Sequence, residues 1–274
     1  MVDAVRICAV VPVYNHAATL ADTVAALGRA GVTTVVVDDG SDAANAAAIE
    51  SIVAAAVART GANRAKSGSQ PVGESHPEGR SQKVAIRLRL ERNSGKGAAV
   101  KCGLRRAAEL GYTHALQVDA DGQHDLADVE RFVATARAQP DAIVIGVPRW
   151  SKDAPLGRRV ARHLTHVWVW INTLSFDIDD SMCGFRIYPL ATTLRLLDAT
   201  GDRMEFDVEI LVRAHWQGIP FAKVPTQVRY PADGVSHFRF VRDNALISMM
   251  HARLFFGMVR RLPQRFWRWI GRNE

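Results

Sequence analysis

Short runs of valine and isoleucine alternate with alanine-rich segments in the first half of the chain. The apolar runs span residues 7–13, 33–39, 84–90, 114–120 and 142–147. The segments between them repeat their apolar positions at helical spacing, over residues 17–29, 42–59, 97–110 and 125–138. Unbroken apolar runs of this length are typical of parallel strands buried on both faces and joined by crossover helices. We therefore predict an α/β fold with a mostly parallel central sheet flanked by helices, whose ligands bind beyond the carboxyl ends of the strands.

The pattern changes after residue 147. Apolar positions at helical spacing predict helices over residues 158–174 and 206–216, and residues 183–188 and 222–230 are typical of strands. Residues 60–82 differ from both halves because they are rich in Gly, Ser, Pro and charged residues and have no period. Such a composition predicts a mobile surface loop, inserted between a helix and a strand.

The last segment predicts an amphipathic helix from about residue 238 to 261. Its apolar stripe is formed by Leu246, Met249, Met250, Leu254 and Met258, and is widened by Phe255, Phe256 and Val259. Arginines flank this stripe, and the sequence after Pro263 is rich in Arg and Trp, which both favour the headgroup region of a membrane. We expect the C-terminal helices, residues 236–274, to lie in a membrane interface, separate from a domain of residues 1–235. The alternative is packing of the helix into the core or a dimer.

The formal net charge of +7 suits nucleic acid, an anionic membrane or a phosphorylated substrate. We expect no nucleic-acid partner, because the arginine excess lies largely in the apolar, Trp-bearing tail and no nucleic-acid motif is present. The three cysteines, Cys8, Cys102 and Cys183, are too few and too far apart for a disulfide framework or a zinc cluster. With no signal-peptide pattern and no spanning apolar run, we expect a cytoplasmic protein bound peripherally to the inner face of the membrane.

Two carboxylates and an amide alternate just after the fourth apolar run, in the segment LQVDADGQHD. Asp119, Asp121 and Gln123 offer oxygen ligands that can converge on a hard divalent cation, and Gly122 gives the backbone freedom to turn. An Asp-x-Asp pair alone is weak evidence, because acidic turns after strands are common. At this point a metal site and a solvated polar turn are both open.

Other polar groups follow the neighbouring strands and are expected at the same edge of the sheet. Asp38 and Asp39 end the second run, where they can accept hydrogen bonds from a nucleobase or ribose, and Tyr14 after the first run can pack on the base. The alternative for Asp39 and the residues after it is a β-turn leading to a helix cap. Lys96, in the Gly-rich NSGKGAAV before a helix, is available to an anion such as a phosphate.

Taken in order, the segments VPVYN, VVVDDGSD, NSGKGAA, VDADGQH, CGFRIY and FDVEILVRA resemble those of family 2 glycosyltransferases with the A-type nucleotide-sugar-binding fold. The similarity covers roughly residues 10 to 215 and is greatest to the dolichyl-phosphate mannosyltransferase and glucosyltransferase-like branch. It implies a catalytic domain that binds a UDP- or GDP-sugar across the strand ends, with Mg²⁺ or Mn²⁺ on the diphosphate.

The resemblance also implies roles for single residues. Asp121 and Gln123 match metal ligands, and Asp119 matches a residue of the metal or nucleoside site. The positions that match nucleoside contacts are Pro12, Tyr14, Asp38 and Asp39.

The implied reaction is an inverting transfer, in which an acceptor oxygen attacks the anomeric carbon while the nucleoside diphosphate leaves. Arg149 and Arg186 are the candidates for contact with the leaving phosphate, because a guanidinium binds phosphate in a bidentate manner. For Arg186 a structural ion pair is the alternative. Asp207 matches the acidic residue near the acceptor and is the candidate general base, with a positioning or structural role as its alternative.

The resemblance implies a lipid-phosphate or lipid-linked acceptor. An alcohol acceptor needs a general base, whereas a lipid phosphate is already anionic. In the segment RYPADGVSHFR, the candidates for contact with the acceptor or the diphosphate are Arg229, His237 and Arg239. Transfer to a hydroxyl acceptor, such as a glycolipid or a polyene-type lipid, and a non-catalytic protein that binds nucleotide sugars are the alternatives.

Overall fold

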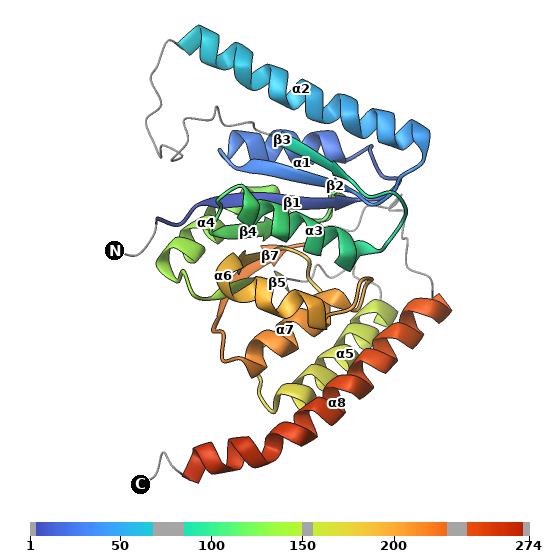
Figure 1. Ribbon diagram of the computed structural model, residues 1–274, viewed down its shortest axis with the longest axis vertical. Helices are drawn as coiled ribbons and strands as arrows, with labels where there is room; N and C mark the ends of the chain where they lie inside the picture. Colours follow the sequence, from blue (N-terminus) through green and yellow to red (C-terminus); the bar gives the residue numbers. More distant parts are fainter. Residues whose placement is uncertain (1–3, 68–84, 150–155, 229–239, 271–274) are drawn as a thin grey trace.

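The computed structural model describes residues 4–67, 85–149, 156–228 and 240–270, which form a central sheet covered by helices (Figure 1). The sheet has seven strands in the order β3-β2-β1-β4-β6-β5-β7. The strands are β1 (Ile7–Val13), β2 (Thr33–Asp38), β3 (Ala85–Arg89), β4 (His114–Gln117), β5 (Ile143–Arg149), β6 (Arg186–Pro189) and β7 (Phe221–Gln227). Strand β6 runs antiparallel to both of its neighbours, and every other pairing is parallel. The predicted mostly parallel α/β sheet is confirmed.

The helices fall into two layers on the two faces of the sheet. The α-helices are α1 (Leu20–Arg29), α2 (Ala43–Ser67), α3 (Lys96–Glu109), α4 (Val129–Ala138), α5 (Leu156–Thr173), α6 (Leu190–Thr193), α7 (Phe206–Trp216) and α8 (Phe240–Ile270). Short 3₁₀ turns, η1 (Leu126–Asp128) and η2 (Leu194–Ala199), precede α4 and follow α6. Side chains of α1, α2 and α4 form one apolar cluster, and side chains of α3, α7 and α8 form part of the other.

Strand β1 explains why the apolar runs are unbroken. Cys8 and Val10 belong to the cluster on one face, whereas Ala9 and Val11 belong to the cluster on the opposite face. Successive side chains of a strand point to opposite faces of the sheet. When helices cover both faces, every side chain of the strand is buried, and apolar residues are favoured at each position. The same argument accounts for the fully buried β2.

The carboxyl ends of the parallel strands meet at one edge of the sheet. Strand β1 is parallel to both of its neighbours, β2 and β4. Strand β5 runs in the same direction as β4, because β6 lies between them and is antiparallel to both. Asp38, the turn at residues 119–122 and Arg149 therefore lie at this edge. The sequence-based prediction of one polar edge is confirmed for these strands.

Several predicted boundaries were wrong, among them the start of β6, which is Arg186 where residue 183 was predicted. Helix α2 continues to Ser67, so the first residues of the predicted loop 60–82 are helical, in keeping with the Ala, Arg and Lys among them, which are strong helix formers. The part of this loop from residue 68 to 82 lies outside the described residues. Strand β4 ends at Gln117, earlier than residue 120, because the polar residues that follow leave the sheet in a turn.

Helix α8 is longer than predicted and continues past Pro263 to Ile270. Met250 and Leu254 are fully buried in the same apolar cluster as α3 and α7, and α8 runs beside α5 (Figure 1). The C-terminal helix thus contributes to the core, and a boundary between domains at residue 235 stays a prediction. In the part of the chain that the structure describes, no helix has the length and apolar character needed to cross a bilayer.

Candidate active site

The segment DADGQ forms the turn that follows β4. Gly122 adopts a φ of +70°, in the left-handed region that glycine tolerates, and the Gln123 amide donates to Asp121 Oδ1 at 3.0 Å. The Thr19 hydroxyl donates to the carbonyl of Ala120 and ties this turn to the start of α1. Burial, and then the neighbouring Asp119 carboxylate, raise the pKa of Asp121. The segment is therefore a polar turn that also gathers two carboxylates, so the two interpretations of the sequence are compatible.

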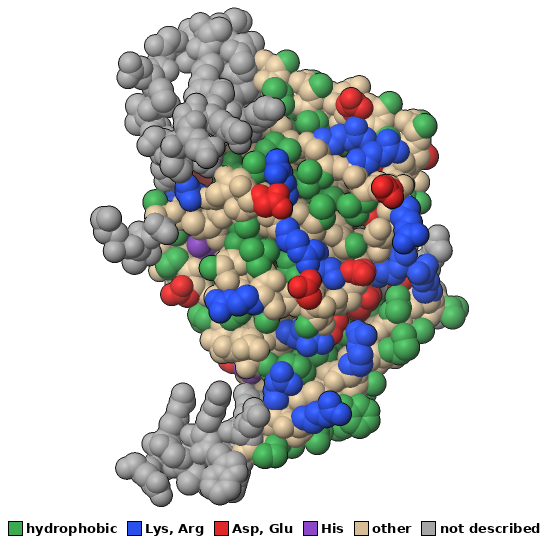
Figure 2. Space-filling view, in the orientation of Figure 1, with side chains coloured by type: hydrophobic (Ala, Val, Ile, Leu, Met, Phe, Trp, Pro, Cys, Tyr) green, Lys and Arg blue, Asp and Glu red, His purple; other side chains and the backbone are tan. Residues whose placement is uncertain are grey.

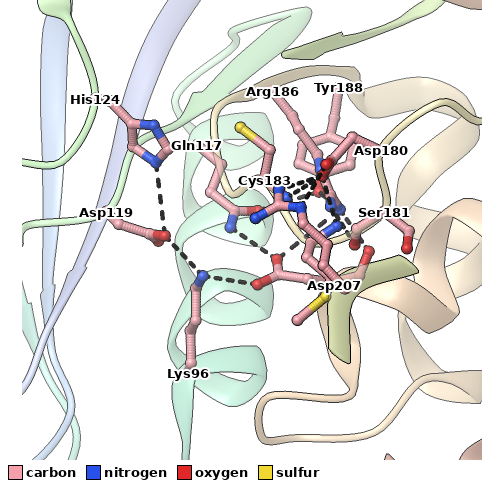
Figure 3. Close-up of polar contacts among 12 residues, drawn as sticks. Lys96, Gln117, Asp119, His124, Asp180, Ser181, Cys183, Arg186, Tyr188 and Asp207 are labelled. Atoms are coloured by element: carbon pink, nitrogen blue, oxygen red, sulfur yellow. Dashed lines mark hydrogen bonds and ion pairs between the residues drawn. The ribbon is translucent and has the colours of Figure 1, made fainter. Parts of the chain in front are cut away.

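Asp119 and Asp207 share one ammonium group, that of Lys96 (Figure 3). Lys96 Nζ lies 2.9 Å from Asp119 Oδ2 and 2.7 Å from Asp207 Oδ2. Burial alone would lower the pKa of Lys96, but the two carboxylates outweigh it and raise the pKa above its usual value. Lys96 is the first residue of α3. Its ammonium group therefore connects the turn after β4 with the first turn of α7.

The carboxylate of Asp207 is held on its other side by the sheet. Gln117 Nε2 donates to Asp207 Oδ1 at 2.9 Å, and the Tyr188 hydroxyl donates to Gln117 Oε1 at 3.1 Å. Because the tyrosine occupies the oxygen of the amide, the amide nitrogen is directed at Asp207. All three side chains are buried. The position of Asp207 is thus fixed by β4 and β6 as well as by α3.

Arg186 lies in the core beneath Asp207. Its side chain is 0% exposed, and its Nη atoms donate to the main-chain oxygen of Asp207 at 2.6 Å and that of Ser181 at 2.7 Å. The Asp207 carboxylate is 3.9 Å away. In this arrangement the guanidinium is enclosed by protein rather than open to a phosphate, so the structure favours the alternative interpretation, a structural ion pair beneath Asp207.

Asp38 and Asp39 lie at the predicted edge, but both carboxylates have protein partners. Asp38 accepts from the Ser41 amide at 2.9 Å and from Arg87 at 3.0 Å. Burial opposes its ionisation, but these hydrogen bonds prevail and hold its pKa below the usual value. Asp39 accepts from the amides of residues 94 and 95 at 2.7 and 2.8 Å, and burial raises its pKa. The chain bends at Gly40 and the Asp42 carboxylate accepts from the Asn45 amide at the start of α2, while Asp39 anchors the loop before α3.

Pro12 is buried within β1 opposite Val37, and Tyr14 follows the strand half-buried. The next residue, Asn15, has a left-handed φ of 47°. Its side-chain oxygen accepts from the Asp42 amide at 2.9 Å, and its own amide donates to Ser41 Oγ at 2.9 Å. These two hydrogen bonds connect the segment after β1 to the segment after β2. The nucleoside contacts of Pro12 and Tyr14 stay predictions.

Arg149 ends β5 at the same edge and is exposed. It lines a small cleft of about 150 Å³ together with Asp125, Asp128, Arg131, Pro225, Thr226 and Gln227. Arg149 thus lies in a charged cleft that Lys96, Asp119 and Asp207 do not line. The other predicted acceptor contacts, Arg229, His237 and Arg239, lie outside the described residues.

Three residues of the site were not predicted individually. Gln117 is a buried amide that follows the apolar Ala115 and Leu116 of β4, which is a usable signal because buried polar groups need partners. His124, stacked on Phe185, places Nε2 3.7 Å from Asp119 Oδ2. A β-carbon at Gly184 would collide with the Asp119 carboxylate, so only glycine allows this close approach. The stacking of His124 on Phe185 and the close approach of Gly184 to Asp119 join segments about 60 residues apart and leave no local pattern.

The oxygen atoms in the turn suit a divalent cation. Asp119 Oδ1 is buried without a hydrogen-bond partner, and the adjacent Asp121 offers a second carboxylate, which are hard ligands of the kind that Mg²⁺ and Mn²⁺ take. Among the described residues, no three His, Cys, Asp or Glu side chains are grouped so as to hold a metal ion. Gln123 is half-buried beside them and remains the predicted third ligand.

Comparison with known proteins gives matches to a family model and to glycosyltransferases. Residues 66–200 match the model described as glycosyl transferase family 2. The chain is 32% identical over 148 residues to a dolichyl-phosphate beta-glucosyltransferase of Dictyostelium discoideum, covering 50% of this chain and 44% of that protein. It is 28% identical to a UDP-N-acetylglucosamine–dolichyl-phosphate N-acetylglucosaminyltransferase of Methanococcus voltae, covering 53% and 59% of the two chains. The matched region thus spans about half of these relatives.

A solved structure has the same fold. The mannosyltransferase of Pyrobaculum calidifontis, in complex with GDP-Man and Mn²⁺, superposes with a TM-score of 0.51 and 16% identity, over 84% of this chain and 58% of that one. At this identity the similarity concerns the arrangement of the sheet and helices alone.

Proposed function

We propose that this chain, which belongs to glycosyl transferase family 2, transfers a sugar from a nucleoside diphosphate to a lipid phosphate at a membrane surface. The observation that carries the proposal is the pairing of Asp119 with Asp207 through Lys96 at the carboxyl edge of the sheet. This edge is where ligands bind in open α/β sheets. The relatives named for dolichyl-phosphate support the acceptor class, and the GDP-Man complex supports a nucleotide-sugar donor.

We infer a division of work across this edge. Asp119, Asp121 and Gln123 would hold Mg²⁺ or Mn²⁺, which would neutralise the charge that grows on the departing diphosphate. The turn after β4 thus lies on the donor side. Asp207, on the first turn of α7, lies on the acceptor side. Lys96 lies between them and offers a positive charge to an oxygen anion arriving from either direction.

The hydrogen bonds of Asp207 favour a phosphate acceptor over an alcohol. Both of its carboxylate oxygens already accept hydrogen bonds, one from Lys96 and one from Gln117. A carboxylate engaged in this way is well placed to orient Lys96 and less free to take a proton from an alcohol. A lipid phosphate needs no such base. We therefore propose a positioning role for Asp207 and leave the general-base role to the alternative of a hydroxyl acceptor.

Donor binding and acceptor choice test this function. We expect calorimetric titration with a panel of UDP- and GDP-sugars to give binding of one donor with Mn²⁺ and little binding without it. Radiolabelled sugar should then pass to a polyprenyl phosphate and not to the matching polyprenol. Transfer to the polyprenol alone would favour the hydroxyl acceptor. Donor binding without transfer to either lipid would favour a non-catalytic partner protein, and no donor binding in folded protein would exclude the proposed donor site.

We further propose that α8 lies on the membrane through that part of the predicted apolar surface which the protein leaves exposed. Part of the predicted stripe, Met250, Leu254 and Met258, is buried against the protein. The exposed apolar residues are Val241, Met249, Phe255, Phe256, Val259 and Leu262. At 100° per residue, Arg242, Arg253 and Arg260 form a row along one border of this outer face. Apolar and basic side chains lie next to one another where α8 runs in Figure 2, as suits an anionic lipid surface.

Substitution on the outer face tests this docking. We expect Phe256→Glu to lower binding to vesicles of phosphatidylcholine and phosphatidylglycerol by about tenfold, because the change removes an exposed aromatic ring that would enter the lipid and adds repulsion from the lipid phosphates. The matched control is Val57→Glu on α2, at the opposite end of the molecule (Figure 1), for which co-sedimentation should be unchanged. Equal binding of both variants would exclude α8 as the membrane contact.

A further inference from the structure

Lys96 supplies a positive charge at the place where the proposed donor site needs a cation. Its Nζ touches Asp119 Oδ2, while the other oxygen of that carboxylate is buried without a partner. The side chains of Lys96 and Asp207 are 17% and 8% exposed, so little water screens the group. Without the ammonium, the carboxylates of Asp119 and Asp207 would lose the cation that they share, and of the described cations Asp207 would keep only the Arg186 guanidinium at 3.9 Å. Loss of a shared cation is costly in a buried site.

We propose that Lys96 is a built-in competitor of the divalent cation, which keeps the metal from binding firmly until the donor diphosphate arrives. This inference rests on the proposed function, because it concerns the same metal and donor. It assigns to Lys96 a role in the order of binding, in addition to the anion contact expected from the sequence.

The competition follows from charge and distance. A divalent cation on Asp119 Oδ1 and Asp121 would lie on the same carboxylate whose other oxygen holds the ammonium, so the two positive charges would repel each other over a few ångströms. The Lys96 ammonium also neutralises part of the negative charge of the Asp119 carboxylate, which would otherwise attract the metal. Both effects weaken metal binding to the protein alone.

The diphosphate removes this conflict because it brings negative charge of its own. It can accept contacts from the metal and from Lys96 at once, so each cation gains a partner and neither has to leave. Because coupling between two ligands is reciprocal, the metal should strengthen donor binding by the same factor as the donor strengthens metal binding. Lys96 also contacts Asp207, which lies on the proposed acceptor side. A movement of Lys96 toward the donor diphosphate would therefore be felt by Asp207 as well.

Titration with Mn²⁺ alone, without donor, tests the proposal through binding and not through activity. Free Mn²⁺ is measured by electron paramagnetic resonance with wild-type protein, Lys96→Met and Lys96→Gln. We expect each variant to bind Mn²⁺ about tenfold more tightly than wild type, as loss of a nearby positive charge predicts. The control is Arg105→Met, which removes a charge from the same helix at an exposed ion pair with Asp198 and should leave the affinity unchanged. Circular dichroism checks that each variant is folded.

A second titration, in the presence of UDP or GDP, separates this proposal from the proposed function. We expect added nucleotide to tighten Mn²⁺ binding strongly in wild type and less in Lys96→Met. If wild type and the folded Lys96 variants bind Mn²⁺ equally without nucleotide, the competition is refuted while the donor site stands. If no protein binds Mn²⁺ even with nucleotide, both the competition and the metal-dependent donor site are refuted.

Discussion

Replacement of Asp121 by alanine is expected to lower sugar transfer by about 10³-fold, the scale on which loss of an electrostatic partner of a leaving group acts. Asp121 lies in the turn beside Asp119, and burial raises its pKa in the absence of a bound cation. A divalent ion between the two carboxylates would favour the ionised form and anchor the diphosphate. The alanine variant keeps Gly122, whose backbone permits the turn, but loses one of the two carboxylates and the acceptor of the Gln123 amide.

The measurement is the rate of transfer at saturating acceptor, together with Mn²⁺-dependent donor binding by calorimetry. The transfer rate and the donor affinity should both decrease, because donor binding and catalysis require the same ion. Asp22→Ala, an exposed residue of α1, is the control with the same change of charge and should behave as wild type. Undiminished transfer by Asp121→Ala would mean that the turn after β4 does not hold the cation.

Replacement of Arg186 by methionine is expected to lower the free energy of unfolding by about 3 kcal/mol, the typical cost of removing one partner of a buried ionic group. The main-chain oxygens of Asp207 and Ser181 would lose their donors inside the core, and methionine cannot replace them. Burial of the guanidinium would by itself lower its pKa, but Tyr188 and Asp207 raise it, so the group remains charged in the core. Urea unfolding followed by circular dichroism measures the change.

The control for Arg186 is Arg195→Met. The Arg195 side chain is exposed and donates a hydrogen bond to the nearby carbonyl of Ala191, so its replacement should change the free energy of unfolding by less than about 0.5 kcal/mol. The same pair of variants distinguishes the two interpretations of Arg186. A structural role predicts a large loss of stability together with weaker transfer. A direct phosphate contact would instead give a protein as stable as wild type whose donor affinity alone is reduced, and that result would restore the sequence-based prediction.

The fold was predictable because its signals are local. Strands β1, β2 and β5 are runs rich in Val and Ile, and the pattern also placed Asp38 and the DADGQ turn at the correct edge of the sheet. The partners of Lys96 were not predictable in this way, because Asp119 is 23 positions and Asp207 111 positions away along the chain. The sequence indicated that Lys96 precedes a helix, but only the packing of α3 against α7 shows which charges it meets.

Helix α8 illustrates a second limit. Its apolar residues surround most of the helix, so the sequence allows either a stripe packed on the protein or a stripe exposed to a membrane. The structure assigns Met250 and Leu254 to the core and leaves Phe256 exposed. Which face packs depends on the shape of α5 and α7 beneath it, and Trp216 of α7, stacked under Arg261 at 4.3 Å, is part of that shape.

The reversed strand β6 has a consequence for synthesis of the protein. It lies between β4 and β5, although it follows both along the chain, so β4 keeps an unpaired edge until residues 186–189 have left the ribosome. An open edge of an apolar strand is a site for wrong pairing with other chains. Chains that stop before residue 186 should therefore be prone to aggregation, and no nascent chain can orient Asp207 before β6 has closed the sheet.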